Sequence, residues 1–462
     1  MKFFLFDSLS RKKKEFVPHN PNEIKIYACG PTVYDYPHIG NARMAVATDL
    51  LSKVLKSIYV NVNFVSNITD IDDKIIKVSN DKNTSIKEIT NKFTKIYNQD
   101  MTSLGVTAPS KQPKATDHID DMIEMINLLL KNKCAYLSDN HVLFNVKKYK
   151  FYGSLSRRSR EEQIAGSRVE IADYKKNAED FILWKPSDSQ EPGWDSPWGR
   201  GRPGWHIECS AMTKKCLGLP FDIHCGGVDL TFPHHENEIA QSCSSISINA
   251  EPTKFCKYWF HNGFVTVNGE KMSKSLGNIT LVNEVLKKYD GSTVRYSLLT
   301  SQYRQPLDWS EKILEQSKKT LLRFRRLMNN FEHCEDENNY QEESYNDFLE
   351  ALYDDLNTPR AFAVLNKCFE KLKKSQGEEA KKKLSTISKS FKLVGINLRK
   401  TNPIHENLNK DEKSQIMRLI LDREAAREKK DFDQADSIRK KLNDLKIEIE
   451  DTPNGTLWKK SE

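Results

Sequence analysis

The sequence predicts a doubly wound α/β domain with a parallel sheet, interrupted by an inserted segment and followed by a helix bundle and a small C-terminal α+β module. Residues 24–28 (IKIYA) form a short apolar run, and a Gly/Pro-rich loop follows that enters a helix near His38. A second such run, at 60–70, comes at the distance expected of a βαβ unit. Beyond residue 310 the sequence pattern becomes helical. The chain length of 462 residues suggests about three domains.

The composition limits the class of protein. Lys and Arg number 72 against 64 Asp and Glu, and this modest excess permits an RNA partner without requiring one. The nine cysteines form no CxxC pair, which indicates reduced, intracellular thiols rather than a disulfide framework. The N-terminal apolar stretch is short, and no later one reaches the roughly 18 residues of a membrane span. We therefore expect a soluble cytoplasmic protein.

Strands and helices alternate through most of the first 310 residues. The first half of the doubly wound domain is predicted over 1–115. The second half is predicted over 201–265, from a strand-like FDIHCGGVDL (221–230) and a helical FPHHENEIAQSCS. A strand pair, WFHNGFVTVNGEKM (259–272), then leads into the segment 266–310.

The residues between the two halves, 116–200, have a different character and are predicted to be an insertion. They are predicted to begin with a helix, IDDMIEMINLLLKN (119–132), and a hairpin, AYLSDNHVLFNV (135–146). A Trp/Pro/Gly-rich stretch closes them. About 80 residues is short for an independent hydrolytic domain, so we expect no proofreading activity there.

The region 311–400 suits a helix bundle. Asp308 is predicted to cap its first helix, with Glu311 completing a capping box. Thr358 is predicted as the cap of a later helix, with Pro359 at its first position.

The tail, 401–462, is predicted as a separate small module. Its Arg/Lys-rich helix has three apolar residues on one side, and a PNG turn between IEIED and TLWKK indicates a hairpin. The three apolar residues are Ile438, Leu442 and Leu445.

Two motifs are candidates for binding phosphate. His38, Gly40 and Asn41 of HIGN stand where a loop becomes a helix, and the backbone N–H groups of a helix N-terminus favour phosphate. Lys271 and Lys274 of KMSKS can neutralise charge on a leaving pyrophosphate. Singly, HIGN is equally explained as a capped helix start and KMSKS as a solvated loop.

Together, in this order and separation, the motifs resemble those of class I aminoacyl-tRNA synthetases. With CGPTVYD, GRPGWHIECS, GGVDLTFPHHENE and DDLNTPRAF they resemble the cysteinyl-tRNA synthetase family over nearly the whole chain. The resemblance implies a class I Rossmann-like catalytic domain. One departure is Asn41, which replaces the last histidine of the class-wide HIGH motif and keeps a hydrogen-bond donor.

A metal site is the second candidate. His234 and Glu238 are four residues apart in a helical pattern and share one face, and from the residues alone a surface ion pair beside packed cysteines remains the alternative. The resemblance implies that Cys29, Cys209, His234 and Glu238 together hold one Zn²⁺. Zinc prefers a thiolate to a hydroxyl, which would admit cysteine and exclude serine. The neighbouring His224, Cys225 and His235 are expected to support or pack around the ligands.

The resemblance also implies the substrate-facing residues. Gly30, Thr69 and Trp205 are expected to form the amino-acid pocket, with His206 beside Trp205. A packing anchor is nearly as good an explanation of Trp205. The residues expected to contact ATP are Thr32, His38, Gly40, Asn41, Gly226, Gly227, Asp229, Lys271, Ser273 and Lys274.

The basic tail is a candidate RNA interface. Cationic residues along it can contact phosphates, which supply affinity but no sequence information, and a solvated helix face is the alternative. These residues are Arg423, Arg427, Lys429, Lys430, Arg439, Lys440 and Lys441. Unpaired anticodon bases are recognised by stacking and by their edges, for which Phe432, Asp436, Asp451 and Trp458 are the candidates.

The implied function is ATP-dependent activation of L-cysteine and its transfer to the 3′-terminal adenosine of cysteine tRNA, with Mg²⁺ accompanying ATP. One rival is a cysteine ligase of the same fold with an amino-sugar acceptor, and the basic tail argues against it. Another is a non-catalytic RNA-binding relative, which the intact motifs make improbable. No extra domain or exposed apolar heptad is evident, so a monomer is expected.

Overall fold

The computed structural model describes residues 2–158, 162, 172–267, 269–272, 277–329, 343–398, 410–428, 431–452 and 455–460. The chain divides into two compact units, each discontinuous in sequence. The first comprises Met1–Val285, Ser301–Trp309 and Tyr353–Leu356, and the second comprises Leu286–Thr300, Ser310–Leu352 and Asn357–Glu462. Among the described residues, no helix combines the length and apolar character needed to cross a bilayer.

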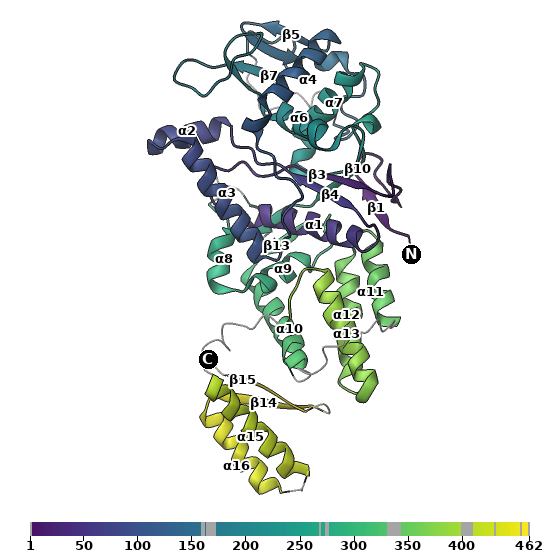
Figure 1. Cartoon of the computed structure of the whole chain (residues 1–462), viewed down its shortest axis with the longest axis vertical. Helices are drawn as coiled ribbons and strands as arrows, with labels where there is room; N and C mark the ends of the chain where they lie inside the picture. Colours follow the sequence, from purple (N-terminus) through teal and green to yellow (C-terminus); the bar gives the residue numbers. More distant parts are fainter. Residues whose placement is uncertain are drawn as a thin grey trace. The chain divides into compact units, whose positions relative to one another are not determined.

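A four-stranded parallel sheet forms the centre of the first unit (Figure 1). Its strands are β3 (Ile24–Ala28), β4 (Val62–Ser66), β9 (Phe221–Gly227) and β10 (Cys256–Asn262), in the order β10-β9-β3-β4. All neighbouring pairs run parallel. The predicted α/β class is confirmed, as are the strand at 24–28 and the cores of the strands expected at 60–70 and 221–230.

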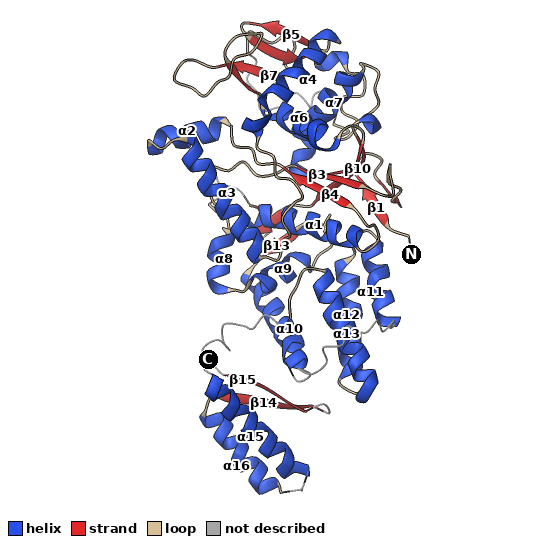
Figure 2. Cartoon of the chain, viewed as in Figure 1, coloured by secondary structure: helices blue, strands red, loops and turns tan. Residues whose placement is uncertain are grey.

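Helices cover both faces of this sheet (Figure 2). Helix α1 (Ile39–Lys56) lies on one side, and α6 (Trp205–Leu217) with α7 (Glu236–Ile246) lies on the other. Tyr27 and Val65 of the sheet share a buried core with Ile207 and Ile239 of those two helices. Because the connections leave β3 and β9 in opposite directions, the carboxyl ends of these adjacent strands form a topological switch point, where open α/β sheets bind ligands.

The insertion contains helix α4 (Ile119–Lys131) and most of a four-stranded antiparallel sheet, whose last strand lies just beyond the predicted end of the insertion at residue 200. The strands are β5 (Ala135–Ser138), β6 (His141–Phe144), β7 (Phe181–Pro186) and β8 (Gly201–Pro203). The helix and the first hairpin match the prediction. Strands β7 and β8 were not predicted, because the Trp/Pro/Gly-rich stretch between them shows no alternating pattern.

Smaller elements complete the first unit. A hairpin, β1 (Phe4–Asp7) with β2 (Lys12–Glu15), and helices α2 (Asp73–Lys82) and α3 (Ile86–Ser103) were not predicted individually. A three-stranded sheet joins β11 (Val265–Val267), β12 (Glu270–Lys271) and β13 (Leu307–Trp309). Single helical turns occur at Ala115–His118, Val146–Lys148, Val228–Leu230, Thr231–His235 and Pro252–Lys254. Helix α8 (Val282–Lys288) follows β12, and its last three residues belong to the second unit.

Two predictions near the KMSKS segment are wrong. The expected strand pair at 259–272 belongs to two sheets, since β10 joins the parallel sheet whereas β11 pairs with β12 and β13. Asp308 is not a helix cap. It lies in β13, where its carboxylate accepts hydrogen bonds from Thr266 Oγ1 and the Gly269 N–H, both at 2.9 Å.

The second unit is mainly helical, as predicted. It holds α9 (Gly291–Leu299), α10 (Glu311–Asn329), α11 (Glu343–Tyr353), α12 (Thr358–Leu372) and α13 (Gly377–Leu393). Thr358 is not the cap of α12: Asn357 is, because its side chain accepts the Arg360 N–H. The helix therefore begins one residue earlier than predicted.

The tail folds as predicted, into helices followed by a hairpin. The elements are α15 (Lys410–Glu428), α16 (Phe432–Asp444), β14 (Ile447–Thr452) and β15 (Gly455–Lys460). Ile438 and Leu442 are buried in its small core. Leu445 is 43% exposed, so its predicted place on the apolar side is wrong, because α16 has already ended there.

Candidate active site and metal centre

Four predicted ligand side chains converge at the switch point. Cys29 directly follows β3, Cys209 lies near the start of α6, His234 lies in the turn before α7, and Glu238 lies in α7 itself. All four are buried. Their four ligand atoms lie within 4.8 Å of one another.

The distances suit a tetrahedral metal. The Cys29 and Cys209 Sγ atoms are 3.8 Å apart, Glu238 Oε1 is 3.3 Å from Cys29 Sγ, and it is 3.0 Å from His234 Nε2. Zinc bonds of about 2.0 to 2.3 Å in a tetrahedron separate ligand atoms by roughly 3.3 to 3.8 Å. The cluster therefore has the dimensions of a metal site.

The buried acidic groups of the cluster also favour a bound cation. Burial raises the pKa of Cys29 and of Glu238 well above the ordinary values, whereas the hydrogen bond with Cys29 lowers the pKa of Cys209 to about 7. Glu238 Oε2 is buried without a hydrogen bond, and the basic atom near it is His224 Nε2 at 3.5 Å. In the described part of the chain no Lys or Arg pairs with Cys29 or Glu238. A buried anionic group is costly unless it is paired or coordinates a metal.

A supporting shell surrounds His234. Its Nδ1 lies 2.9 Å from His206 Nδ1, which leaves Nε2 facing the cluster. Trp205 stacks on the His234 ring with centroids 4.4 Å apart, yet remains 40% exposed. Trp205 is therefore a partly open wall beside the candidate metal rather than a core anchor.

A second, overlapping group joins Cys29 and Glu238 with His224 and His235, again within 4.8 Å. His224 Nε2 is 3.4 Å from Cys29 Sγ. His235 Nδ1 is 2.8 Å from His261 Nε2, and both histidines are surrounded by aromatic rings such as Trp259. They line the buried back of the cluster, where their geometry also allows them to be ligands, and the supporting place expected of them stays a prediction.

Two residues of the site were not predicted. Asn67 Oδ1 accepts the Gly30 N–H at 2.8 Å and lies 3.7 Å from Cys209 Sγ. Glu208, buried next to Cys209, accepts a hydrogen bond from Thr69 Oγ1 at 3.2 Å. The available signal was position, because Asn67 lies in the strand predicted over 60–70 and directly follows β4, and Glu208 stands inside the motif GRPGWHIECS.

Gly30 and Thr69, two of the predicted pocket residues, take part in these contacts with Asn67 and Glu208. A side chain on Gly30 would place its Cβ 1.6 Å from the Asn67 carbonyl oxygen, so only glycine fits there. Thr69 forms a β-bridge with Thr32. Burial, followed by the neighbouring Cys209, raises the pKa of Glu208 well above its ordinary value.

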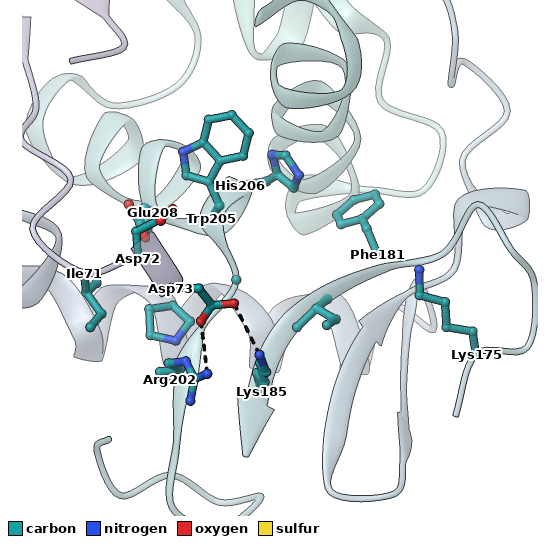
Figure 3. Close-up of a pocket in the computed structure, with 13 residues that line it drawn as sticks. Ile71, Asp72, Asp73, Lys175, Phe181, Lys185, Arg202, Trp205, His206 and Glu208 are labelled. Carbon is teal, nitrogen blue, oxygen red and sulfur yellow. Dashed lines mark hydrogen bonds and ion pairs between the residues drawn. The ribbon is translucent and has the colours of Figure 1, made fainter. Parts of the chain in front are cut away.

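A cavity of about 240 Å³ opens beside these residues (Figure 3). Trp205, His206 and Glu208 line it together with aromatic and charged side chains from the insertion. Asp73 in this cavity pairs with Arg202 at 3.1 Å and Lys185 at 3.3 Å. The cavity is thus lined both by residues that neighbour the candidate ligands and by residues of the insertion.

The HIGN residues start α1. His38 Nδ1 accepts the Asn41 N–H and Asn41 Oδ1 accepts the His38 N–H, so the pair forms a capping box. A Cβ on Gly40 would lie 2.9 Å from the His38 ring and 3.3 Å from Met272 Cε. The Ile39 N–H donates to Thr280 at 2.9 Å. HIGN therefore lies beside the chain that flanks KMSKS.

The other predicted ATP residues are placed as follows. Gly226 and Gly227 end β9, where an added Cβ would meet His235 or Asp229 at 2.5 Å. Lys271 ends β12. Ser273 and Lys274 lie outside the described residues.

The predicted RNA contacts in the tail divide into two kinds. Phe432 is 63% exposed and Asp436 is exposed. Trp458 packs on the module's core. Asp451 binds Arg423 through both carboxylate oxygens and also pairs with Arg427. Lys429 and Lys430 lie outside the described residues.

Comparisons with known proteins agree with this architecture. Residues 15–319 match the family of tRNA synthetases class I (C) catalytic domain, and residues 347–399 match the DALR domain. A Mycobacterium tuberculosis methionyl-tRNA synthetase in complex with methionyl-adenylate superposes with a TM-score of 0.56 at 14% identity, covering 81% of this chain and 89% of that one. A putative arginyl-tRNA synthetase from Campylobacter jejuni gives a TM-score of 0.53 at 12% identity, covering 82% and 94%.

The fold and the catalytic-domain match define a class I aminoacyl-tRNA synthetase. A cysteine–tRNA ligase from Pelagibacter ubique is 48% identical over 463 residues, covering 99% of this chain and 98% of the relative. One from Maricaulis maris is 45% identical over 467 residues, covering 99% and 98%. The chain belongs to the cysteine–tRNA ligase family.

Proposed function

We propose that the protein activates L-cysteine with ATP and transfers it to the 3′-terminal adenosine of cysteine tRNA. The observation that carries this proposal is the cluster of Cys29, Cys209, His234 and Glu238. It stands at the switch point of a class I fold, beside a cavity. Membership in the cysteine–tRNA ligase family supports the choice of substrate.

The two thiolates, one imidazole and one carboxylate of the cluster suit Zn²⁺. Zinc bound there would favour the substrate in its thiolate form and would distinguish cysteine from serine by ligand softness. A pocket without a metal would discriminate between cysteine and serine by only about a hundredfold, because the two amino acids differ in one small group. Among the two overlapping groups, the one containing Cys209 and His234 is favoured, because its Trp205 and His206 neighbours line the cavity.

The start of α1 would hold the phosphates of ATP. Gly40 allows close approach to the backbone, and the positive end of the α1 dipole favours an anion there. The capping box keeps His38 and Asn41 in place at this end. Lys271 and Lys274 would then stabilise charge on the departing pyrophosphate, and Mg²⁺ would accompany ATP.

The reaction needs no enzyme nucleophile. A carboxylate oxygen of cysteine attacks the α-phosphorus of ATP, a new P–O bond forms, and pyrophosphate leaves. The 2′-hydroxyl of the terminal adenosine then attacks the carbonyl carbon, the bond to AMP breaks, and the hydroxyl proton is released. Gly30, Thr69 and Trp205 would hold the amino acid while both steps occur.

The exposed residues of the tail would contact the RNA. Arg439, Lys440 and Lys441 are exposed on α16 and suit phosphate contacts. Phe432 and Asp436 suit an unpaired base. We further propose a monomer, which light scattering would check.

The test is charging of purified cysteine tRNA with labelled cysteine, with serine as the control. We expect cysteine to be transferred, serine to be rejected, and charging to be lost on chelation and restored by Zn²⁺. Cysteine-dependent pyrophosphate exchange without charging would instead support a ligase with another acceptor. Loss of both activities would support a non-catalytic RNA-binding protein.

A further inference from the structure

The cavity of Figure 3 contains a lysine whose charge is not paired. Lys175, which the insertion contributes, lines the cavity on the side of Phe181. In the described part of the chain, no ion pair or side-chain hydrogen bond joins Lys175 to another residue. The other two long cations of the cavity, Lys185 and Arg202, both pair with Asp73. Lys175 is therefore the cation that this cavity offers to a ligand.

The acid that acts on Lys175 is already bound by other donors. Burial lowers the pKa of Lys175, and the charge of Asp180 only partly opposes this shift. One carboxylate oxygen of Asp180 accepts the Val146 N–H at 3.0 Å. The other accepts the Tyr136 hydroxyl at 2.8 Å and the Asn177 N–H at 3.1 Å. An anion that entered the cavity would therefore stabilise the charged form of Lys175.

The cavity also borders the place where the amino acid would be held. Trp205 and His206 line it, and both contact the candidate ligand His234. Trp205 stacks on the His234 ring, and His206 Nδ1 lies 2.9 Å from His234 Nδ1. If cysteine is bound by its sulfur at the cluster, the carbonyl carbon that is attacked in the second step lies close to this cavity.

Two phosphate-bearing substrates must reach this region, and the lining of the cavity distinguishes them. ATP is expected at the start of α1, and none of residues 38–41, all of which the structure describes, lines the cavity. Its volume of about 240 Å³ is below the roughly 300 to 1,000 Å³ of pockets for drug-sized ligands, so it can receive one unpaired nucleotide of an RNA. Such nucleotides are bound by aromatic rings and by cations at phosphate, and Phe181, Trp205 and Lys175 supply both.

We propose that Lys175 binds a phosphate group near the 3′ end of the tRNA and so holds the terminal adenosine against the activated cysteine. The contact is made in the second step alone, after the amino acid has been activated. The inference rests on the proposed function, because it requires an RNA acceptor and an adenylate at the cluster. It assigns a step-specific substrate contact to a residue of the insertion.

The test compares intact cysteine tRNA with the same RNA lacking its last three nucleotides. Dissociation constants are measured by filter binding on the full chain. Lys175→Met keeps the length of the side chain and removes its charge. We expect this variant to bind intact tRNA about 10-fold more weakly, the low end for a hydrogen bond to a charged group, because Lys175 is half-buried. Its affinity for the shortened RNA should stay within about twofold of wild type.

Two further measurements separate a phosphate contact from a general effect on folding. The slope of log affinity against log salt concentration should become shallower by about 0.7 for intact tRNA, the value for one phosphate contact of a single strand. In a single turnover at limiting tRNA, transfer from the adenylate should slow about 10-fold. The KM values for cysteine and ATP in pyrophosphate exchange should stay within about twofold of wild type.

Lys176→Met is the matched control, because Lys176 is exposed and its ammonium lies over the Tyr136 ring, outside the cavity. It should leave the preference for intact tRNA unchanged, and Lys175→Arg should retain that preference. Lys175→Gln gives the same comparison if Lys175→Met does not fold. Equal weakening of both RNAs, weakening of neither, or a raised KM for cysteine would overturn the proposal. A wild-type chain that exchanges pyrophosphate but charges no tRNA would instead refute the proposed function.

Discussion

Cys209 and Cys225 show how differently two buried cysteines of one unit are used. Cys209 lies 3.8 Å from Cys29 and has a lowered pKa, near 7. Cys225 lies in β9, outside both ligand groups, and burial raises its pKa well above the ordinary value. Burial alone therefore does not make a ligand, because a ligand also needs donor atoms converging on it.

We expect Cys209→Ser to lose bound zinc, since a hydroxyl is a poor substitute for a thiolate ligand. Elemental analysis of the purified protein should show metal near one equivalent in wild type and well below half in the variant. Cys225→Ser is the matched control and should keep its metal. Equal metal content in all three proteins would show that Cys209 is not a ligand.

At the scale of single elements, α3 ends with an unfavourable charge. Asp100 lies in its last turn, where the helix dipole disfavours an anion, and Oδ2 is buried without a hydrogen bond. Burial raises the pKa of Asp100 from 3.8 to about 6. The folded state therefore binds this proton more tightly than the unfolded chain does, and stability falls as pH rises from about 4 through 6.

Asp100→Asn should remove that penalty. We expect a gain of about 1 to 2 kcal/mol in unfolding free energy at pH 7.5, after allowance for the partial exposure of the group, and almost none at pH 4. Denaturant unfolding at the two pH values measures both. A gain of the same size at both pH values would mean that the charge is not its cause.

The C-terminal hairpin is held by an ion pair. Arg423 is 3% exposed and binds both carboxylate oxygens of Asp451 at 2.6 and 2.8 Å. The hydrogen bonds from Arg423 and the charge of Arg427 lower the pKa of Asp451. The bond pattern favours a structural role for Asp451 over the RNA contact that its sequence position suggested.

Asp451→Ala should therefore leave a buried guanidinium without its partner. The expected cost is about 1 to 3 kcal/mol, reduced because Asp451 is partly exposed, and it should appear as faster hydrogen exchange across α15 and β14. Asp444→Ala, an exposed change on α16, should leave exchange unchanged. Weaker tRNA binding by Asp451→Ala with unchanged exchange would restore the RNA role.

At the scale of the whole molecule, periodicity predicted the elements whose partners are near in sequence. The strand at 24–28, helix α4 and the tail hairpin were all identified from apolar spacing and turn residues. The four candidate ligands were predicted through a resemblance, because no spacing in the sequence brings Cys29 to Glu238. Asn67 and Glu208 were not predicted as site residues, because their contacts are made between elements that are separate in the sequence.

Arg43 and Asp355 illustrate the same limit. Arg43, 2% exposed, donates to the carbonyl oxygens of Gln302 and Tyr303, some 260 positions away. Asp355 accepts hydrogen bonds from the Phe6 N–H, Tyr303 Oη and Arg304 Nε. Such contacts unite distant segments of the first unit, and local sequence pattern carries no information about them.

Asp355→Asn should destabilise this unit. The amide cannot serve all three donors, and we expect a loss of about 2 to 4 kcal/mol and a lower melting temperature. Asp354→Asn is the matched neighbour, since Asp354 is half-buried and its ion pair is with surface Lys13. This change should cost below about 1 kcal/mol. Similar melting of the two variants would contradict a central role for Asp355.

Because the first unit is discontinuous in sequence, its segments are synthesised at different times during translation. Its parallel sheet has left the ribosome once Val285 has emerged, but Asp355 is made roughly seventy residues later, about 4 to 14 seconds at ordinary synthesis rates. Until Asp355 is made, Phe6 and, once they are synthesised, Tyr303 and Arg304 lack their common acceptor. The nascent catalytic unit must wait for part of the helical region to be synthesised before it can close, which makes this the period when chaperones would bind it best.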